Sequence, residues 1–143
     1  MTFFPDVNVW LALIVAEHAQ SGQAQAWAEE TSRDWLALNR ITQMGVMRLL
    51  TNRAVMAGDA MTGAAAWRVV DELLEHENIR FAREPDGLEK AWRDLTPPAV
   101  TGPNFWTDAY LAAFARTTGF TLVTFDRGFS KYRDIPVKIL ASA

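Results

Sequence analysis

The feature that most constrains the fold of this chain is an alternation of short apolar runs with longer segments of helical character. The short runs are apolar almost throughout, which is typical of parallel strands covered on both faces. Helices between such strands form the covering layers. The sequence therefore predicts an α/β fold, a three-layer α/β/α sandwich with a mainly parallel central sheet.

The expected elements follow one another without a linker, an internal repeat or a low-complexity tract. We expect strands at residues 2–6, 34–40, 79–82, 120–126 and 137–140. We expect helices at residues 7–18, 21–33, 41–53, 58–77, 86–95 and 104–119, and a loop at 97–103. Asp59 should cap the helix at 58–77, and Asn104 and Gly119 should bound the last helix. The length of 143 residues fits one domain, residues 1–143.

The composition excludes several classes of protein. Half of the residues are hydrophobic and 22% are charged, which argues against disorder. No apolar run is long enough to span a membrane, and the N-terminal apolar stretch lacks the basic start of a signal peptide. The chain has no cysteine, which fits a reducing compartment, so we expect a cytoplasmic protein. The net charge of −3 means that any binding of nucleic acid must rely on local basic groups or on bound cations.

Six tryptophans are a high number for this length. We expect Trp10, Trp27, Trp67 and Trp92 to pack in the core or between helices. Stacking on nucleobases is the alternative for each of them.

Three aspartates are placed at one edge of the expected sheet. Asp6 follows the first strand and Asp126 follows the fourth, so both lie where the carboxyl ends of the strands meet and where such sheets bind ligands. Asp108 lies early in the last helix, on the apolar face that should cover the sheet. Each also has a structural alternative, since Asp6 could cap a helix, Asp126 could open a turn and Asp108 could complement the helix dipole.

Carboxylates that converge from separate segments repel one another, and a divalent cation would remove that repulsion. Hard oxygen ligands suit Mg²⁺ or Mn²⁺. A metal held beyond a parallel sheet indicates phosphate-ester chemistry, in which the ion orients and activates water. Asn8 could steady Asp6 or bond to the first helical turn, and Thr124 could reach the site through water from the face it shares with Asp126.

Four segments occur in a characteristic order: PDVNVWLAL, RITQMGVMRLLTN, TDAYLAAFA and LVTFDRGF. Together they resemble the PIN-domain ribonucleases, specifically the VapC-type toxins of bacterial toxin–antitoxin pairs, over nearly the whole chain. The resemblance implies a PIN-like sandwich, a Mg²⁺-dependent endoribonuclease, a homodimer and a cognate antitoxin protein that blocks the site. It assigns Asp6, Asp108 and Asp126 to the metal-binding and catalytic acids of the family.

The sequence departs from the family pattern in the third helix, where these domains usually carry a glutamate. No Asp or Glu occurs from Trp35 to Gly58. The helix register places the missing acid near Gln43 or Gly45. Gln43 could orient a water or be only a residue of the first helical turn. Three carboxylates suffice for one Mg²⁺ and leave a second ion open.

Basic residues near the expected edge could hold RNA phosphates. Arg40 follows the second strand, Arg48 lies in the third helix, and Arg127 follows Asp126. Each alone could be a solvated surface charge, whereas as a set they could flank the metal.

Two other functions compete with the ribonuclease. A haloacid-dehalogenase-like phosphatase would use Asp6 as its nucleophile, but it requires a second aspartate where this chain has Asn8. A catalytically weak PIN-like module that only binds a partner is motivated by the missing glutamate. A phospho-aspartate at Asp6 would indicate the phosphatase, and tight partner binding without RNA cleavage would indicate the binding module.

Overall fold

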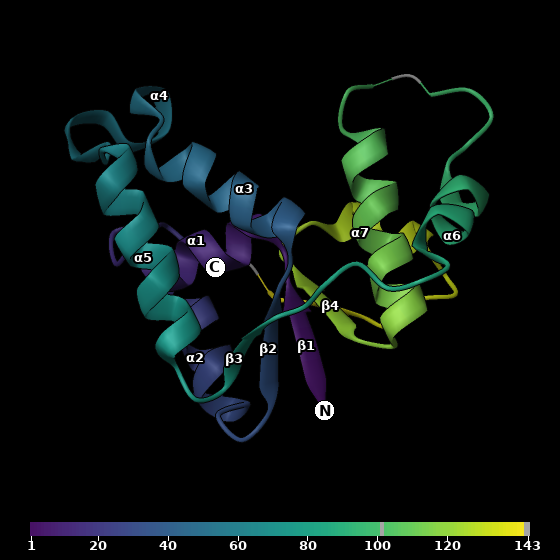
Figure 1. The fold of residues 1–143 in the computed structure, drawn as a ribbon, viewed down its shortest axis with the longest axis horizontal. Coiled ribbons are helices and arrows are strands. Elements are labelled where there is room, and N and C mark those ends of the chain that lie inside the picture. Colours follow the sequence, from purple (N-terminus) through teal and green to yellow (C-terminus); the bar gives the residue numbers. More distant parts are fainter. Residues whose placement is uncertain (101, 142–143) are drawn as a thin grey trace.

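A parallel five-stranded sheet forms the centre of the computed structural model, which describes residues 1–100 and 102–141 (Figure 1). The strands lie in the order β3-β2-β1-β4-β5, and every neighbouring pair is parallel. Their bounds are β1 Thr2–Pro5, β2 Trp35–Leu38, β3 Ile79–Phe81, β4 Thr121–Thr124 and β5 Val137–Ile139. The predicted parallel sheet is thereby confirmed.

Helices cover both faces of this sheet (Figure 1). One layer contains α1 Val7–Ile14, α2 Ser21–Glu30, α3 Arg40–Leu50 and α5 Gly63–Glu75, and α4 Arg53–Met56 follows α3. The other layer contains α6 Leu88–Leu95 and α7 Phe105–Thr118. Two short 3₁₀ helices complete the chain, η1 Ala57–Asp59 and η2 Arg127–Lys131. The three-layer α/β/α sandwich is confirmed.

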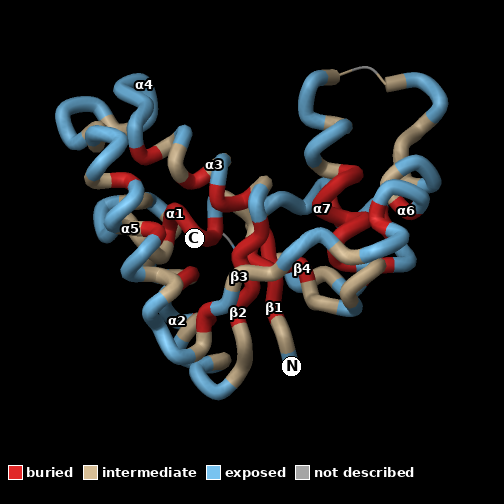
Figure 2. Tube along the Cα trace, viewed as in Figure 1, coloured by how far each residue is buried: buried red, intermediate tan, exposed pale blue. Residues whose placement is uncertain are grey.

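Alternate strand residues divide between the two layers. Phe3 and Val123 pack with the α1 side, whereas Phe4 and Leu122 pack with the α7 side. This period of two is the geometry of a strand, and apolar residues at every position allow both faces to be buried. Figure 2 shows the buried residues along the strands and the inner sides of the helices.

The largest error in the predicted elements concerns the start of α5. Thr62, not Asp59, caps this helix, and its hydroxyl accepts a hydrogen bond from the amide of Ala65 at 3.2 Å. Asp59 instead belongs to η1, which follows α4, a helix that the sequence did not predict. Ala57, with a positive φ of 50°, ends α4 and begins η1. The apolar spacing predicted one long helix because spacing carries no signal for such a local change of backbone conformation.

The other ends of elements differ by a few residues. Helix α1 ends at Ile14, four residues early, because Val15 is extended. Gly119 ends α7 with φ of 77°, as predicted, while Asn104 holds the cap position without a capping hydrogen bond from its side chain. The predicted loop at 97–103 contains residue 101, which lies outside the described residues; the other positions of this loop form no helix or strand. Across the described ranges, no helix is both long and apolar enough to span a bilayer.

The packing role predicted for the tryptophans holds for most of them. Trp10 and Trp27 are buried, and Trp92 is half-buried against α7. Trp67 is 53% exposed on α5, so its predicted core role is wrong. Its neighbours Ala66 and Val70 occupy the buried face of α5 instead.

Candidate active site

Asp6 connects β1 to α1 at the carboxyl edge of the sheet. Its Oδ1 accepts a hydrogen bond from the amide of Val7 at 2.6 Å, so it is the N-cap of α1. Its Oδ2 accepts a hydrogen bond from the hydroxyl of Thr124 at 2.9 Å. Burial raises the pKa of Asp6, the bonds from Thr124 and Val7 oppose this rise, and the charge of Asp126 adds to it. Capping therefore explains one oxygen of Asp6 but not its position beside other acids.

Asp126 follows β4, the strand that pairs with β1. Its Oδ1 accepts a hydrogen bond from the amide of Gly128 at 2.8 Å, so the turn role considered from the sequence is present. Its own amide donates to the hydroxyl of Thr124 at 3.0 Å. Thr124 thus joins the two strand ends directly, by hydrogen bonds to Asp6 and Asp126, and the predicted contact through water is wrong because the hydroxyl already lies within bonding distance.

Asp108 lies in the first turn of α7 and is half-buried. Its side chain makes no hydrogen bond within residues 1–100 and 102–141. Burial and the charge of Asp126 raise its pKa, Lys131 lowers it, and Asp6 raises it again. The structure therefore brings Asp6, Asp108 and Asp126 into one group of carboxylates that repel one another.

The chemistry of this group suits a hard divalent cation, although the three side chains are not gathered around one point. Among the described residues, no three acidic or histidine side chains stand close enough to hold a metal ion by themselves. Mg²⁺ normally keeps several waters and takes only one or two carboxylates directly. Asp126 is exposed and Asp108 has free oxygens, whereas both oxygens of Asp6 already accept hydrogen bonds. The residues fit a hydrated ion held by Asp108 and Asp126 next to a fixed Asp6.

The two positions considered for the missing glutamate differ in the structure. Gln43 is only 5% exposed, and its Oε1 accepts a hydrogen bond from the guanidinium of Arg40. At Gly45, an added Cβ would lie 2.6 Å from Cγ2 of Val7, so α3 approaches α1 where a larger residue would need space. A glutamate at Gly45 would require Val7 to move. Helix packing therefore opposes an acid at Gly45, whereas position 43 holds a glutamine bonded to Arg40.

The remaining predicted site residues do not form one cluster. Asn8 is exposed and its side chain makes no hydrogen bond in the described part of the chain, so it neither steadies Asp6 nor caps α1. Arg40 and Arg48 line a groove between α3 and α5. Arg127 begins η2 directly after Asp126.

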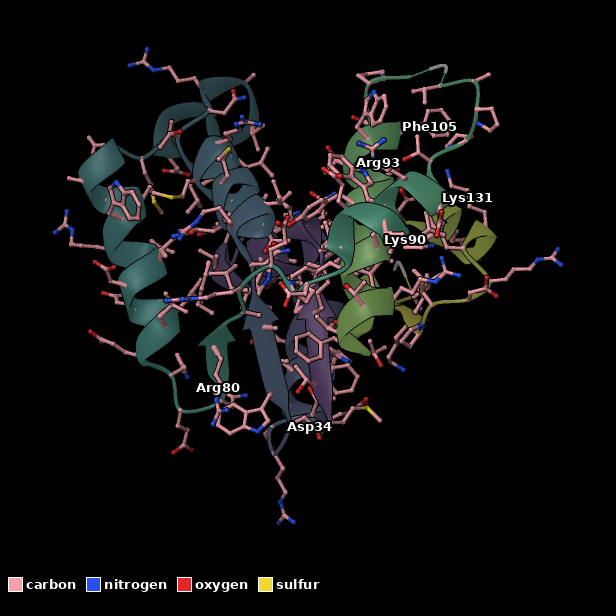
Figure 3. The ribbon with its side chains drawn as sticks, turned by 45° about the vertical axis from the view of Figure 1, so that its right-hand side comes forward. Asp34, Arg80, Lys90, Arg93, Phe105 and Lys131 are labelled. Atoms are coloured by element: carbon pink, nitrogen blue, oxygen red, sulfur yellow. The ribbon has the colours of Figure 1, made fainter. Side chains whose placement is uncertain are left out.

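Sequence reasoning missed two buried polar groups near this edge. Asn39 is 1% exposed and caps α3 through a bond from the amide of Thr42, but its Nδ2 has no partner. The Tyr132 hydroxyl is buried without a partner, and burial together with the charge of Asp108 raises its pKa. The Lys131 ammonium lies 4.7 Å from the centre of the Phe105 ring (Figure 3). The rule that located Asp6 could have found Asn39, because it too directly follows a strand of the sheet.

Comparison with known proteins agrees with this geometry. A family model for the PIN domain matches residues 3–135. This chain belongs to the PIN-domain family. A ribonuclease named VapC41 from Mycobacterium tuberculosis is 39% identical over 141 residues, covering 95% of this chain and 97% of the relative. Its relatives thus place this PIN domain in the VapC group.

Two solved structures share the fold at low sequence identity. VapBC2 from Rickettsia felis, solved bound to a DNA fragment from its promoter, gives a TM-score of 0.72 at 13% identity and covers 99% of this chain and 100% of that one. VapC20 from Mycobacterium tuberculosis, described as a toxin that cleaves the sarcin-ricin loop, gives 0.69 at 21% identity and covers 97% and 99%. At these identities the likeness supports the fold of the PIN domain alone.

Proposed function

We propose that this PIN domain is a Mg²⁺-dependent endoribonuclease and the toxin of a toxin–antitoxin pair. The observation that carries the proposal is the electrostatic coupling of Asp6, Asp108 and Asp126 at the carboxyl edge of the sheet. Like charges that raise one another's pKa oppose folding unless a cation is bound, and such groups concentrate at functional sites. The ribonuclease name of the relative that is 39% identical supports the same reaction.

In this proposal, Asp108 and Asp126 hold the ion and Asp6 faces the attacking water. The ion, when bound, supplies charge stabilisation at the phosphate and lowers the pKa of water. Hydrogen bonds from Val7 and Thr124 fix the Asp6 carboxylate. The raised pKa of Asp6 suits a group that accepts a proton. Mn²⁺ has the same preference for oxygen ligands and should replace Mg²⁺.

The partners follow from the VapC group rather than from the geometry. RNA is the substrate, and a cognate antitoxin protein blocks the site; the structural neighbour VapBC2 is named as such a pair. We propose a homodimer on the family resemblance, and a cytoplasmic location because the substrate is RNA. Arg127, directly after Asp126, and Arg40 and Arg48, in the groove between α3 and α5, supply positive charge for RNA phosphates.

A second candidate is a catalytically weak PIN-like binding module. The observation that favours it is that α3 carries no acidic residue: Gln43 bonds to Arg40, and Val7 packs against Gly45. A haloacid-dehalogenase-like phosphatase belongs to a different family, so membership of the PIN-domain family excludes this function.

The test is cleavage of RNA by the wild type and by Asp6→Asn, each in Mg²⁺ and in EDTA. If the protein is a metal-dependent ribonuclease, the wild type should cleave RNA in Mg²⁺ but not in EDTA. Undiminished cleavage in EDTA would refute the metal site, and undiminished cleavage by Asp6→Asn would refute the role of Asp6. No cleavage of any RNA, together with tight binding of the antitoxin, would establish the binding module.

A further inference from the structure

A large pocket lined by aromatic side chains opens between the start of α3 and the helices α6 and α7. Its volume is about 810 Å³, within the range of ligand-binding pockets. One wall comes from α6 and α7 and the other from β3 and the start of α3. Thr107, which lines it, precedes Asp108 in α7, and Asn39 follows β2, the strand next to β1, so the pocket opens at the same edge of the sheet as the acids.

The α6–α7 wall consists of three aromatic side chains in a fixed arrangement. The Trp92 ring stands perpendicular to Tyr110 and Trp106, at 5.4 and 6.2 Å between ring centres. The indole N–H of Trp92 also donates to the carbonyl of Trp106 at 3.0 Å. Trp106 itself is 52% exposed. A large ring that is held in place yet left open to solvent is a typical ligand platform rather than a core residue.

The opposite wall is also aromatic and carries positive charge. The guanidinium of Arg40 lies 4.6 Å from the centre of the Phe81 ring. Arg83 lines the same wall, so two cations border the pocket. A flat aromatic ligand between these walls would meet the aromatic side chains of α6 and α7 on one side and the Arg40 guanidinium over Phe81 on the other, and the cations would attract its phosphate.

Polar groups in the pocket can recognise donors and acceptors. The Nδ2 of Asn39, which lines the pocket, is buried without a hydrogen-bond partner in the described chain. The Glu84 carboxylate accepts a hydrogen bond from Tyr110 at 3.0 Å through Oε1 only. One unused donor and one unused acceptor suit the edge of a nucleobase, which presents both.

We propose that this pocket holds one unstacked nucleobase of a single-stranded RNA whose phosphate lies at the acids. The inference rests on the proposed ribonuclease function, because RNA is its ligand. Stacking on aromatic side chains is the usual way in which proteins bind splayed-out bases. The pocket would thus set how the strand enters the catalytic site.

The test measures binding in EDTA and low salt, with intact RNA verified afterwards on a gel. The probes are a mixed-sequence single-stranded RNA and a ribose-phosphate strand of equal length that has no bases. Trp106→Ala should lower affinity for the RNA about 5- to 150-fold, the range for loss of one stacked base, and leave affinity for the abasic strand unchanged. Val55→Ala is the control, since Val55 is 48% exposed on α4 and lies outside both the aromatic pocket and the groove that Arg40 and Arg48 line, and it should bind both strands like the wild type.

Equal losses for both strands in Trp106→Ala would overturn the inference, because they would indicate a lost surface rather than a lost base contact. Unchanged RNA affinity in Trp106→Ala would also overturn it. Cleavage in Mg²⁺, assayed in parallel, separates the two proposals. A wild type that binds as expected but never cleaves refutes only the ribonuclease, and a wild type that cleaves without this binding pattern refutes only the base pocket.

Discussion

Charged groups are paired at the amino ends of the strands but repel one another at the carboxyl ends. Toward the amino ends of the strands, the chain's amino group lies 3.3 Å from Asp34, and the Arg80 guanidinium lies 3.2 Å from the centre of the Trp35 ring (Figure 3). At the carboxyl ends, Asp6, Asp108 and Asp126 repel one another. The charges at the amino ends are compensated by neighbours, whereas the repelling group at the carboxyl ends is what the proposed metal ion would compensate.

The largest expected effect is on catalysis at the carboxyl edge. Asp126→Asn should lower RNA cleavage roughly 10²–10³-fold, the cost of losing one electrostatic group that stabilises a transition state. Asp34→Asn, at the opposite edge, should cleave like the wild type. Rates in Mg²⁺ under identical conditions make the comparison, and comparable losses in the two variants would remove the distinction between the edges.

Thr124→Val should destabilise the protein by about 1–3 kcal/mol. The change keeps the shape of the side chain but removes the hydroxyl that donates to Asp6 and accepts from the amide of Asp126. Urea unfolding measures the loss, and Thr124→Ser, which retains the hydroxyl, should recover most of it. Equal stability of Thr124→Val and the wild type would mean that this hydroxyl does not hold the two strand ends.

Asp108→Asn should stabilise the metal-free protein at neutral pH by a few degrees, since about 1 kcal/mol shifts the melting temperature by roughly 4 °C in a domain of this size. The pKa of Asp108 is raised in the folded state, whereas the unfolded value is about 3.9. Its ionisation therefore costs no stability below the unfolded pKa, the cost grows as pH rises from the unfolded pKa to the folded pKa, and it is fully present above the folded pKa. The variant should lack this part of the pH dependence.

Mg²⁺ should reverse the order of the two proteins, because the folded wild type gains stability from an ion that the variant binds less well. Thermal melting of both proteins in EDTA and in excess Mg²⁺ is the measurement. If Asp108 served only the helix dipole, the variant would be less stable by the same amount in both buffers.

The smallest effect is expected at the amino edge. Arg80→Ala should cost about 0.5–1 kcal/mol, the usual value of an exposed cation–π contact, and should leave cleavage unchanged. Urea unfolding and the RNA assay give both readouts. A loss as large as that of Thr124→Val would show that the two edges contribute equally to stability.

The sheet was predictable from the sequence because its signals are local. Apolar runs at every strand position require two covering layers, and the acid after a strand must lie at the carboxyl edge whatever the remaining contacts. For this reason Asp6 and Asp126 could be placed before the fold was known. The helix spacing placed Asp108 on the inner face of α7 by the same kind of local argument.

Only the tertiary structure decided which of several equivalent residues serve the site. Trp67 and Trp106 both lie on helices and are 53% and 52% exposed, yet Trp67 lines the groove between α3 and α5 whereas Trp106 lines the pocket formed by β3, α6 and α7. The approach of Val7 to Gly45 and the direct bond from Thr124 to Asp6 join segments far apart in the chain. Spacing along one segment carries no information about such contacts, because they depend on how whole helices and strands pack against one another.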